Sequence, residues 1–212
     1  MRSASPYRMD RRTIAAVEAF APQGLDLGVE ALVFAQSDNG PGTALTEVET
    51  MAARCERHGA SLAVVSDEPA EGRLLMNARR LAYTALEATG AALLDDVCVP
   101  PGRIAELIDG VEEIAAAVGL TIGTFGHAGD GNMHPTVVYD RDDPEQVAAA
   151  GQGFDRILDL ALSLDGTVTG EHGVGVLKRA AAQGEMGGAH DLHLAVKRAL
   201  DPAGLLNPGK AI

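Results

Sequence analysis

Apolar residues recur along the chain at two spacings, and these spacings predict strands that alternate with amphipathic helices. Between residues 104 and 118 the apolar positions fall three or four residues apart, which indicates a helix with one buried face. Pro144, directly after Asp143, suits the first turn of another helix. The pattern predicts strands at 30–36, 61–66, 93–99, 120–125 and 133–139, and helices at 45–59, 67–88, 104–118, 143–164 and in a segment that ends at Leu200.

The order of these elements favours an α+β or α/β sandwich, in which helices pack on one face of a sheet. The first twelve residues differ from the rest, because they are polar, carry four arginines and show no period. We therefore expect a disordered leader over residues 1–25 and one folded domain over residues 26–212.

Charge and composition argue against several classes of function. Seventeen Lys and Arg against 30 Asp and Glu give a formal net charge of −13, which disfavours binding to nucleic acid or to anionic lipid. The hydrophobic share of 46% suffices for a core, whereas 3% aromatic residues disfavour a stacking platform for bases. No apolar run is long enough to insert into a bilayer, and two cysteines form no disulfide framework, so we expect a cytoplasmic protein.

Two glycine-rich segments interrupt the alanine-rich helices and hold three of the six histidines: GHAGDGNMH at 126–134 and GEHGVG at 170–175. In the first, Asp130 and Gly131 lie between two predicted strands, and this dipeptide is typical of a two-residue hairpin turn. Such a turn pairs His127 directly with His134, with the Cβ atoms roughly 5 Å apart. Two imidazoles at that separation can share a metal ion.

The second segment supplies the acidic group that such a metal site needs. Glu171, together with the two histidines, would complete a catalytic two-histidine, one-carboxylate site with positions left open for substrate or water. His172 follows directly, so in an extended backbone its side chain points the opposite way and is free to act as an acid or base. Each feature taken singly is more often structural, but their combination favours a functional site.

Three segments, GTFGHAGDGNMHP, GEHGVGVLKR and DPAGLLNPGK, resemble in this order the carboxy-terminal cap domain of the FAD-linked oxidases and dehydrogenases of 2-hydroxy acids. This family includes glycolate oxidase, D-lactate dehydrogenase and D-2-hydroxyglutarate dehydrogenase. The resemblance implies a ferredoxin-like antiparallel sheet with helices on one face, and oxidation of a small 2-hydroxy acid to the 2-oxo acid with hydride transfer to FAD. It also implies a divalent metal such as Zn, Mn or Fe on His127, His134 and Glu171, with His172 as the catalytic base.

Further roles come from the same resemblance alone. It places Asn132 beside the substrate and Asn207 near the flavin. It assigns binding of the substrate carboxylate to Arg79. However, Met76 stands where relatives usually have a tryptophan, and the adjacent Arg80 fits the spacing equally well.

In that family the flavin is held mostly by a separate amino-terminal domain, so an FAD-binding domain or subunit is the expected partner. Nothing before Glu30 resembles its glycine-rich pyrophosphate loop. We therefore expect a split subunit, a fragment of a disrupted gene or a misplaced start. Two other classes stay open: a binding or assembly module without catalysis, and a non-haem iron enzyme, which the predicted long helices disfavour.

Overall fold

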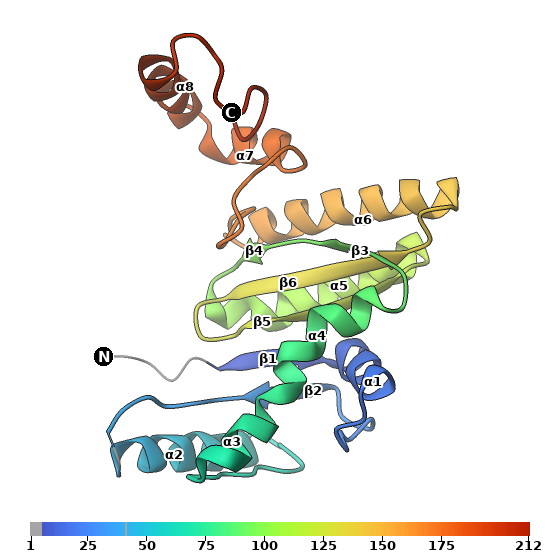
Figure 1. Cartoon of the computed structure of the whole chain (residues 1–212), viewed down its shortest axis with the longest axis vertical. Coiled ribbons are helices and arrows are strands. Elements are labelled where there is room, and N and C mark those ends of the chain that lie inside the picture. The colour runs from blue at the N-terminus through green and yellow to red at the C-terminus, as the bar shows by residue number, and fades with distance from the viewer. Residues whose placement is uncertain (1–5, 41) are drawn as a thin grey trace.

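The computed structural model describes residues 6–40 and 42–212, and an antiparallel sheet lies at its centre (Figure 1). The strand order is β2-β1-β5-β6-β3, and β4 also pairs with β6. The strands are β1 (Tyr7–Asp10), β2 (Ala31–Phe34), β3 (Ala91–Leu94), β4 (Val97–Cys98), β5 (Thr121–His127) and β6 (Asn132–Tyr139). The helices are α1 (Arg11–Phe20), α2 (Thr43–Arg57), α3 (Pro69–Leu75), α4 (Asn77–Glu87), α5 (Ile104–Val118), α6 (Pro144–Ser163), α7 (Arg179–Met186) and α8 (Ala189–Leu200).

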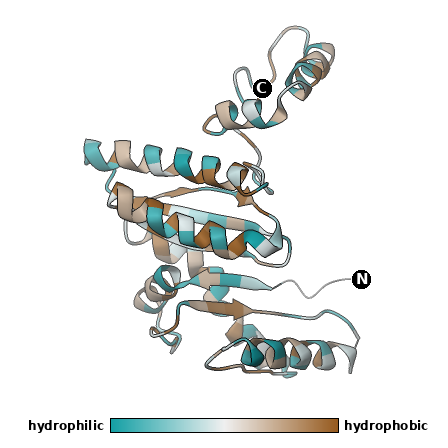
Figure 2. Ribbon diagram, turned by 180° about the vertical axis from the view of Figure 1, so that it is seen from behind, coloured by the Kyte–Doolittle hydropathy of each residue, from teal (hydrophilic) through white to brown (hydrophobic). Residues whose placement is uncertain are grey.

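The predicted class, an α+β fold built on an antiparallel sheet, is confirmed, but the helices cover both faces of the sheet instead of one. Met133 and Val137 of β6 pack in one core cluster with α5 and α6. Val138 of the same strand packs in a second cluster with α1 and α4. Accordingly, α4 lies in front of the sheet in Figure 1 and α5 lies in front of it in Figure 2. A central strand buried at nearly every position needs cover on both sides.

The expectation of a disordered leader is wrong for the described residues before position 26. Tyr7 and Met9 are buried in strand β1, which pairs with β2 on one side and with β5 on the other. The buried carboxylate of Asp10 caps α1 by accepting from the backbone N–H of Thr13 at 2.8 Å, and it also accepts from that of Thr124 in β5 at 2.8 Å. A four-residue strand followed at once by a helix is too short to show a period in the sequence.

Most other predicted elements are confirmed, with three differences. The helices at α2, α5 and α6 form as expected, and Asp143 caps α6. The segment 61–66 is not a strand, since its backbone pairs with no strand in the described part of the chain, and Leu62 stays 76% exposed. The predicted helix 67–88 breaks at Met76 into α3 and α4, and the predicted strand 93–99 breaks into β3 and β4 at two buried aspartates, Asp95 and Asp96.

The carboxy-terminal residues form an arm that projects from the sheet and contains α7 and α8 (Figure 1). Several apolar side chains on this arm are exposed, among them Leu192 and Leu200 of α8, and brown stretches mark the arm in Figure 2. None of the helices in the described ranges is long and apolar enough to cross a membrane.

Candidate metal and substrate site

The β5–β6 hairpin pairs its strands in a different register from the one expected. His127 pairs with Asn132, and His134 pairs with Phe125, so the connection is a four-residue loop and not a two-residue turn. The expected turn requires a positive φ at Asp130, but in the described chain the positive-φ residues other than glycine are Asp165, Asn207 and Ala211. The register therefore differs by two residues, which leaves every side chain on the face expected for it.

Because the two-residue difference preserves the face, His127 and His134 still meet as diagonal neighbours across the strands. Their ring centroids are 5.9 Å apart. The carboxylate oxygen Oε1 of Glu171 lies 3.4 Å from Nε2 of His134 and 3.7 Å from Nε2 of His127. The structure thus brings together the three residues expected to bind a metal, and their ligand atoms lie within 4.8 Å of one another.

His172 belongs to the same cluster and does not point away from it, as an extended backbone would require. Its ring stacks on that of His134 at 5.0 Å with an interplanar angle of 7°. Its Nε2 lies 3.8 Å from Oε1 of Glu171, and its side chain is half-exposed. The backbone of this loop is irregular, which allows adjacent side chains to face one side.

A buried aspartate that the sequence analysis missed holds this loop in place. Asp96 Oδ2 accepts from the backbone N–H groups of Gly170, Glu171 and His172 at 3.0, 3.1 and 2.8 Å. It also accepts from the hydroxyl of Thr169 at 3.1 Å. Burial would raise the pKa of Asp96, but the N–H of His172 and the other donors outweigh burial and hold that pKa below its ordinary value.

A buried ion pair lies directly behind this aspartate. Lys178 Nζ is 2.8 Å from Oδ1 of Asp95, and it donates to the carbonyl oxygens of Asp96 at 2.6 Å and Val168 at 2.7 Å. Burial raises the pKa of Asp95 even though the Lys178 cation opposes that rise. Two consecutive acidic residues between apolar ones, LLDDV, were the sequence signal for this arrangement, since buried carboxylates require partners.

Asn132, expected beside the substrate, packs against the second glycine-rich segment. A Cβ at Gly170 would lie 2.4 Å from the Asn132 side chain, so a residue without a side chain is needed there. Asn132 is buried, and its Oδ1 has no hydrogen-bond partner among the described residues. This amide oxygen is itself buried, and Asn132 is not among the residues that line the neighbouring cavity, so its expected place beside the substrate stays a prediction.

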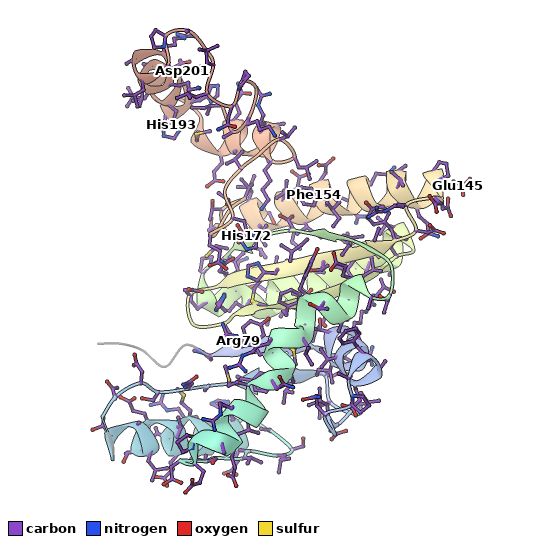
Figure 3. All side chains as sticks on the ribbon, in the orientation of Figure 1. Arg79, Glu145, Phe154, His172, His193 and Asp201 are labelled. Atoms are coloured by element: carbon purple, nitrogen blue, oxygen red, sulfur yellow. The ribbon has the colours of Figure 1, made fainter. Side chains whose placement is uncertain are left out.

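A cavity of about 540 Å³ lies beside the histidine cluster and is open to both candidate arginines. Figure 3 labels Arg79 and His172, and both lie toward the end of the sheet that carries the β5–β6 loop. Arg79 is half-buried against Tyr7, whereas the adjacent Arg80 is exposed. The cavity is lined by Tyr7, Gln36, Met76, Arg79, Arg80, Leu94, Phe125, His127, His134 and His172. Asn207 lies in the tail after α8 and is not among these residues.

The chemistry of the cluster suits a divalent transition ion. Burial lowers the pKa of His134 below its ordinary value, and the nearby carboxylates of Asp96 and Glu171 only partly oppose this effect. Neutral imidazole is the form that ligates metals. A second group, formed by Asp96, His134 and His172, has the same potential on geometric grounds.

Comparison with known proteins matches residues 4–211 to the family described as FAD linked oxidases, C-terminal domain. The chain is 34% identical over 204 residues to the glycolate oxidase subunit GlcD of Bacillus subtilis, covering 95% of the chain and 43% of that protein. It is 36% identical over 160 residues to the mitochondrial cytochrome D-lactate dehydrogenase of Arabidopsis thaliana, covering 74% of the chain and 28% of that protein.

A solved structure shares the fold at lower identity. The chain superposes on 4-ethylphenol oxidase from Gulosibacter chungangensis with a TM-score of 0.64 and 16% identity, over 98% of the chain and 47% of that structure. The chain thus spans less than half the length of these relatives. Since the family match extends over almost every residue, the chain belongs to the C-terminal domain family of the FAD linked oxidases.

Proposed function

We propose that the chain is the substrate- and metal-binding domain of an FAD-dependent oxidoreductase. Its substrate would be a small 2-hydroxy acid of the D-lactate, glycolate or 2-hydroxyglutarate class, oxidised to the 2-oxo acid. The family and the names of the relatives support this reaction class. The observation that carries the proposal is the position of Oε1 of Glu171 among three imidazoles, next to a cavity that Arg79 lines.

His127, His134 and Glu171 would hold a divalent ion such as Zn, Mn or Fe. Their ligand atoms already converge, and His134 and Glu171 come from segments 37 positions apart in the sequence. When bound, the ion would act as a Lewis acid on the substrate oxygens, and FAD would accept the hydride. Three protein ligands leave coordination positions for the substrate.

The remaining residues would bind the substrate and move its proton. His172 is half-exposed beside Glu171, so its ring can take a proton from the substrate hydroxyl and pass it to water. Arg79 would bind the substrate carboxylate, because a guanidinium group forms two parallel hydrogen bonds with a carboxylate. Asn132, which pairs with His127 across the hairpin, would help to orient the substrate.

The flavin would be held mainly by an FAD-binding domain or subunit, with Asn207 of the tail close to it. Exposed Leu205 and Leu206 on the same tail offer apolar surface for that partner. We also propose a cytoplasmic location, which the two free cysteines, Cys55 and Cys98, support.

Reconstitution tests this function. The chain co-expressed with the FAD-binding domain or subunit of the same enzyme should purify yellow and reduce a dye with D-lactate, glycolate or 2-hydroxyglutarate. His172→Ala should keep its metal and lose turnover about a hundredfold or more. Glu171→Ala should lose metal and turnover together, while His193→Ala, an exposed change on α8, should alter neither. Full turnover in His172→Ala, or loss of its metal, would contradict the assigned roles.

A further inference from the structure

We propose that Asp96 is a positioning residue. Its carboxylate fixes the backbone around Glu171 and orients the ring of His134, so that both residues present their ligand atoms to one ion. The inference rests on the proposed function, since it assumes that these residues bind a metal. Asp96 touches neither the cavity nor the atoms assigned to substrate. Its effect would act through the backbone of one ligand and the imidazole of another.

The first link is to the Glu171 loop. Three consecutive backbone N–H groups, those of Gly170, Glu171 and His172, point at one carboxylate oxygen of Asp96. Successive N–H groups that converge in this way form a concave anion site, and here a side chain of the protein fills it. The peptide units on both sides of Glu171 are therefore fixed, although the Glu171 side chain itself is 52% exposed.

The second link is to His134. Oδ1 of Asp96 lies 3.7 Å from Nδ1 of His134, which has no hydrogen-bond partner in the described chain. Glu171 lies on the opposite side of the same ring, at Nε2. A carboxylate on the Nδ1 side favours the tautomer that carries its proton there, and this tautomer leaves the Nε2 lone pair free for a metal.

Asp96 is itself anchored. The Lys178 ammonium binds the carbonyl oxygens of Asp96 and Val168, and it pairs with Asp95. Cys98 and Thr167 exchange two backbone hydrogen bonds, of 3.1 and 2.8 Å. The segment before the loop is therefore tied at several points to the segment that carries Asp96, and the aspartate has a fixed position from which to act.

Asp96 could alternatively be a ligand, since Asp96, His134 and His172 also converge. The hydrogen bonds favour the positioning role. Oδ2 already accepts from four donors, and Oδ1 accepts from the N–H of Glu171 at 3.3 Å. A carboxylate used in this way by the backbone has little capacity left for an ion.

The test compares Asp96→Asn with a matched control, Asp10→Asn. Asp10 is also a buried aspartate that accepts from two backbone N–H groups, but these hydrogen bonds link α1 to β5 and involve neither a histidine nor Glu171. Asp96→Asn keeps only one acceptor oxygen, so its NH₂ group must face either the loop N–H groups or Nδ1 of His134. We expect Zn²⁺ to bind 10- to 100-fold more weakly in Asp96→Asn and normally in Asp10→Asn.

Two readouts separate a positioning residue from a ligand and from a purely structural residue. At saturation, Asp96→Asn should bind Co²⁺ with the wild-type stoichiometry and absorption spectrum, because the ligands themselves are unchanged. A changed spectrum would make Asp96 a ligand, and an unchanged Zn²⁺ affinity would remove its role. Either result overturns the inference while leaving metal binding by the wild type intact.

A measurement on the wild type alone keeps the inference testable if Asp96→Asn does not fold or if no metal binds. Amide hydrogen exchange should show Gly170, Glu171 and His172 exchanging at least about a hundredfold more slowly than free loop amides, despite the exposure of this loop. Unprotected exchange at these three positions would overturn the positioning role. Absence of Zn²⁺ binding in the wild type would instead overturn the proposed function.

Discussion

The guanidinium carbon of Arg79 lies 4.5 Å from the centre of the Tyr7 ring, which links helix α4 to strand β1 beside the cavity. The same ring meets His127 edge to face, with centroids 5.6 Å apart. A cation over an aromatic face is attracted to it, so Tyr7 restrains the direction of Arg79. Among the described residues, Arg80 has no such aromatic contact, and it is more exposed.

The first prediction follows from this difference between the two arginines. In the Zn²⁺-loaded chain, Arg79→Gln should weaken the binding of D-lactate or glycolate by about 10- to 100-fold, since a charge-assisted hydrogen bond contributes about 1.5–3 kcal/mol. Arg80→Gln should change the affinity by less than about threefold. Isothermal titration calorimetry measures both. The opposite ranking would move the carboxylate-binding role to Arg80.

The second prediction concerns the turn at Gly131. Its φ is +86°, and a Cβ there would lie 1.8 Å from the carbonyl oxygen of Val99. Gly131→Ala should therefore lower the free energy of unfolding by more than about 1 kcal/mol. Gly151 lies on the exposed side of α6, where an added Cβ would meet no described atom within 4 Å, so Gly151→Ala should raise the free energy of unfolding by about 0.5–1 kcal/mol. Urea unfolding measures both, and equal effects would refute the described turn.

The third prediction concerns the ion pair of Lys178 and Asp95. Their side chains are 7% and 0% exposed, so Lys178→Met leaves a buried carboxylate without its cation. The loss in unfolding free energy should be about 3–5 kcal/mol. Adding Asp95→Asn to Lys178→Met should restore part of the lost unfolding free energy, because the second substitution removes the unpaired charge. A double variant less stable than Lys178→Met would contradict this account.

The fourth prediction is a pH dependence caused by His134. Burial lowers the pKa of its imidazole below 6.5, so below pH 6.5 the unfolded chain binds a proton that the folded chain resists. The stability contributed by neutral His134 is thus present above pH 6.5 and is lost as the pH falls. In metal-free protein, wild type should lose more stability between pH 7.5 and 5.5 than His134→Gln does. Identical losses of stability in the two proteins would show that His134 does not cause the pH dependence.

The hairpin shows how much of the site could be predicted from sequence. The consecutive residues Asp130 and Gly131 predicted a two-residue turn, but the backbone forms a four-residue loop. The prediction that His127 and His134 lie close together is still correct. Strand side chains alternate between the two faces with a period of two, and the predicted register was wrong by two residues. A one-residue error would have placed one histidine on the other face of the sheet.

Tyr7 and Asp96 show what the sequence could not reveal by its pattern alone. Tyr7 lies in a short strand within an arginine-rich segment, and its burial depends on pairing with β2 and β5, which are distant in the sequence. Asp96 stands out as a carboxylate between apolar residues, but its donors lie more than 70 positions later. Local periodicity carries no information about such partners.

The central claim, that His127, His134 and Glu171 bind one divalent ion, is tested most directly by the metal content of the purified chain. Elemental analysis should find about one transition ion per chain in the wild type and in His193→Ala, and almost none in His134→Ala, since loss of one of three protein ligands sharply lowers affinity. Equal metal content in wild type and His134→Ala, or a wild type that takes up no ion, would contradict the account.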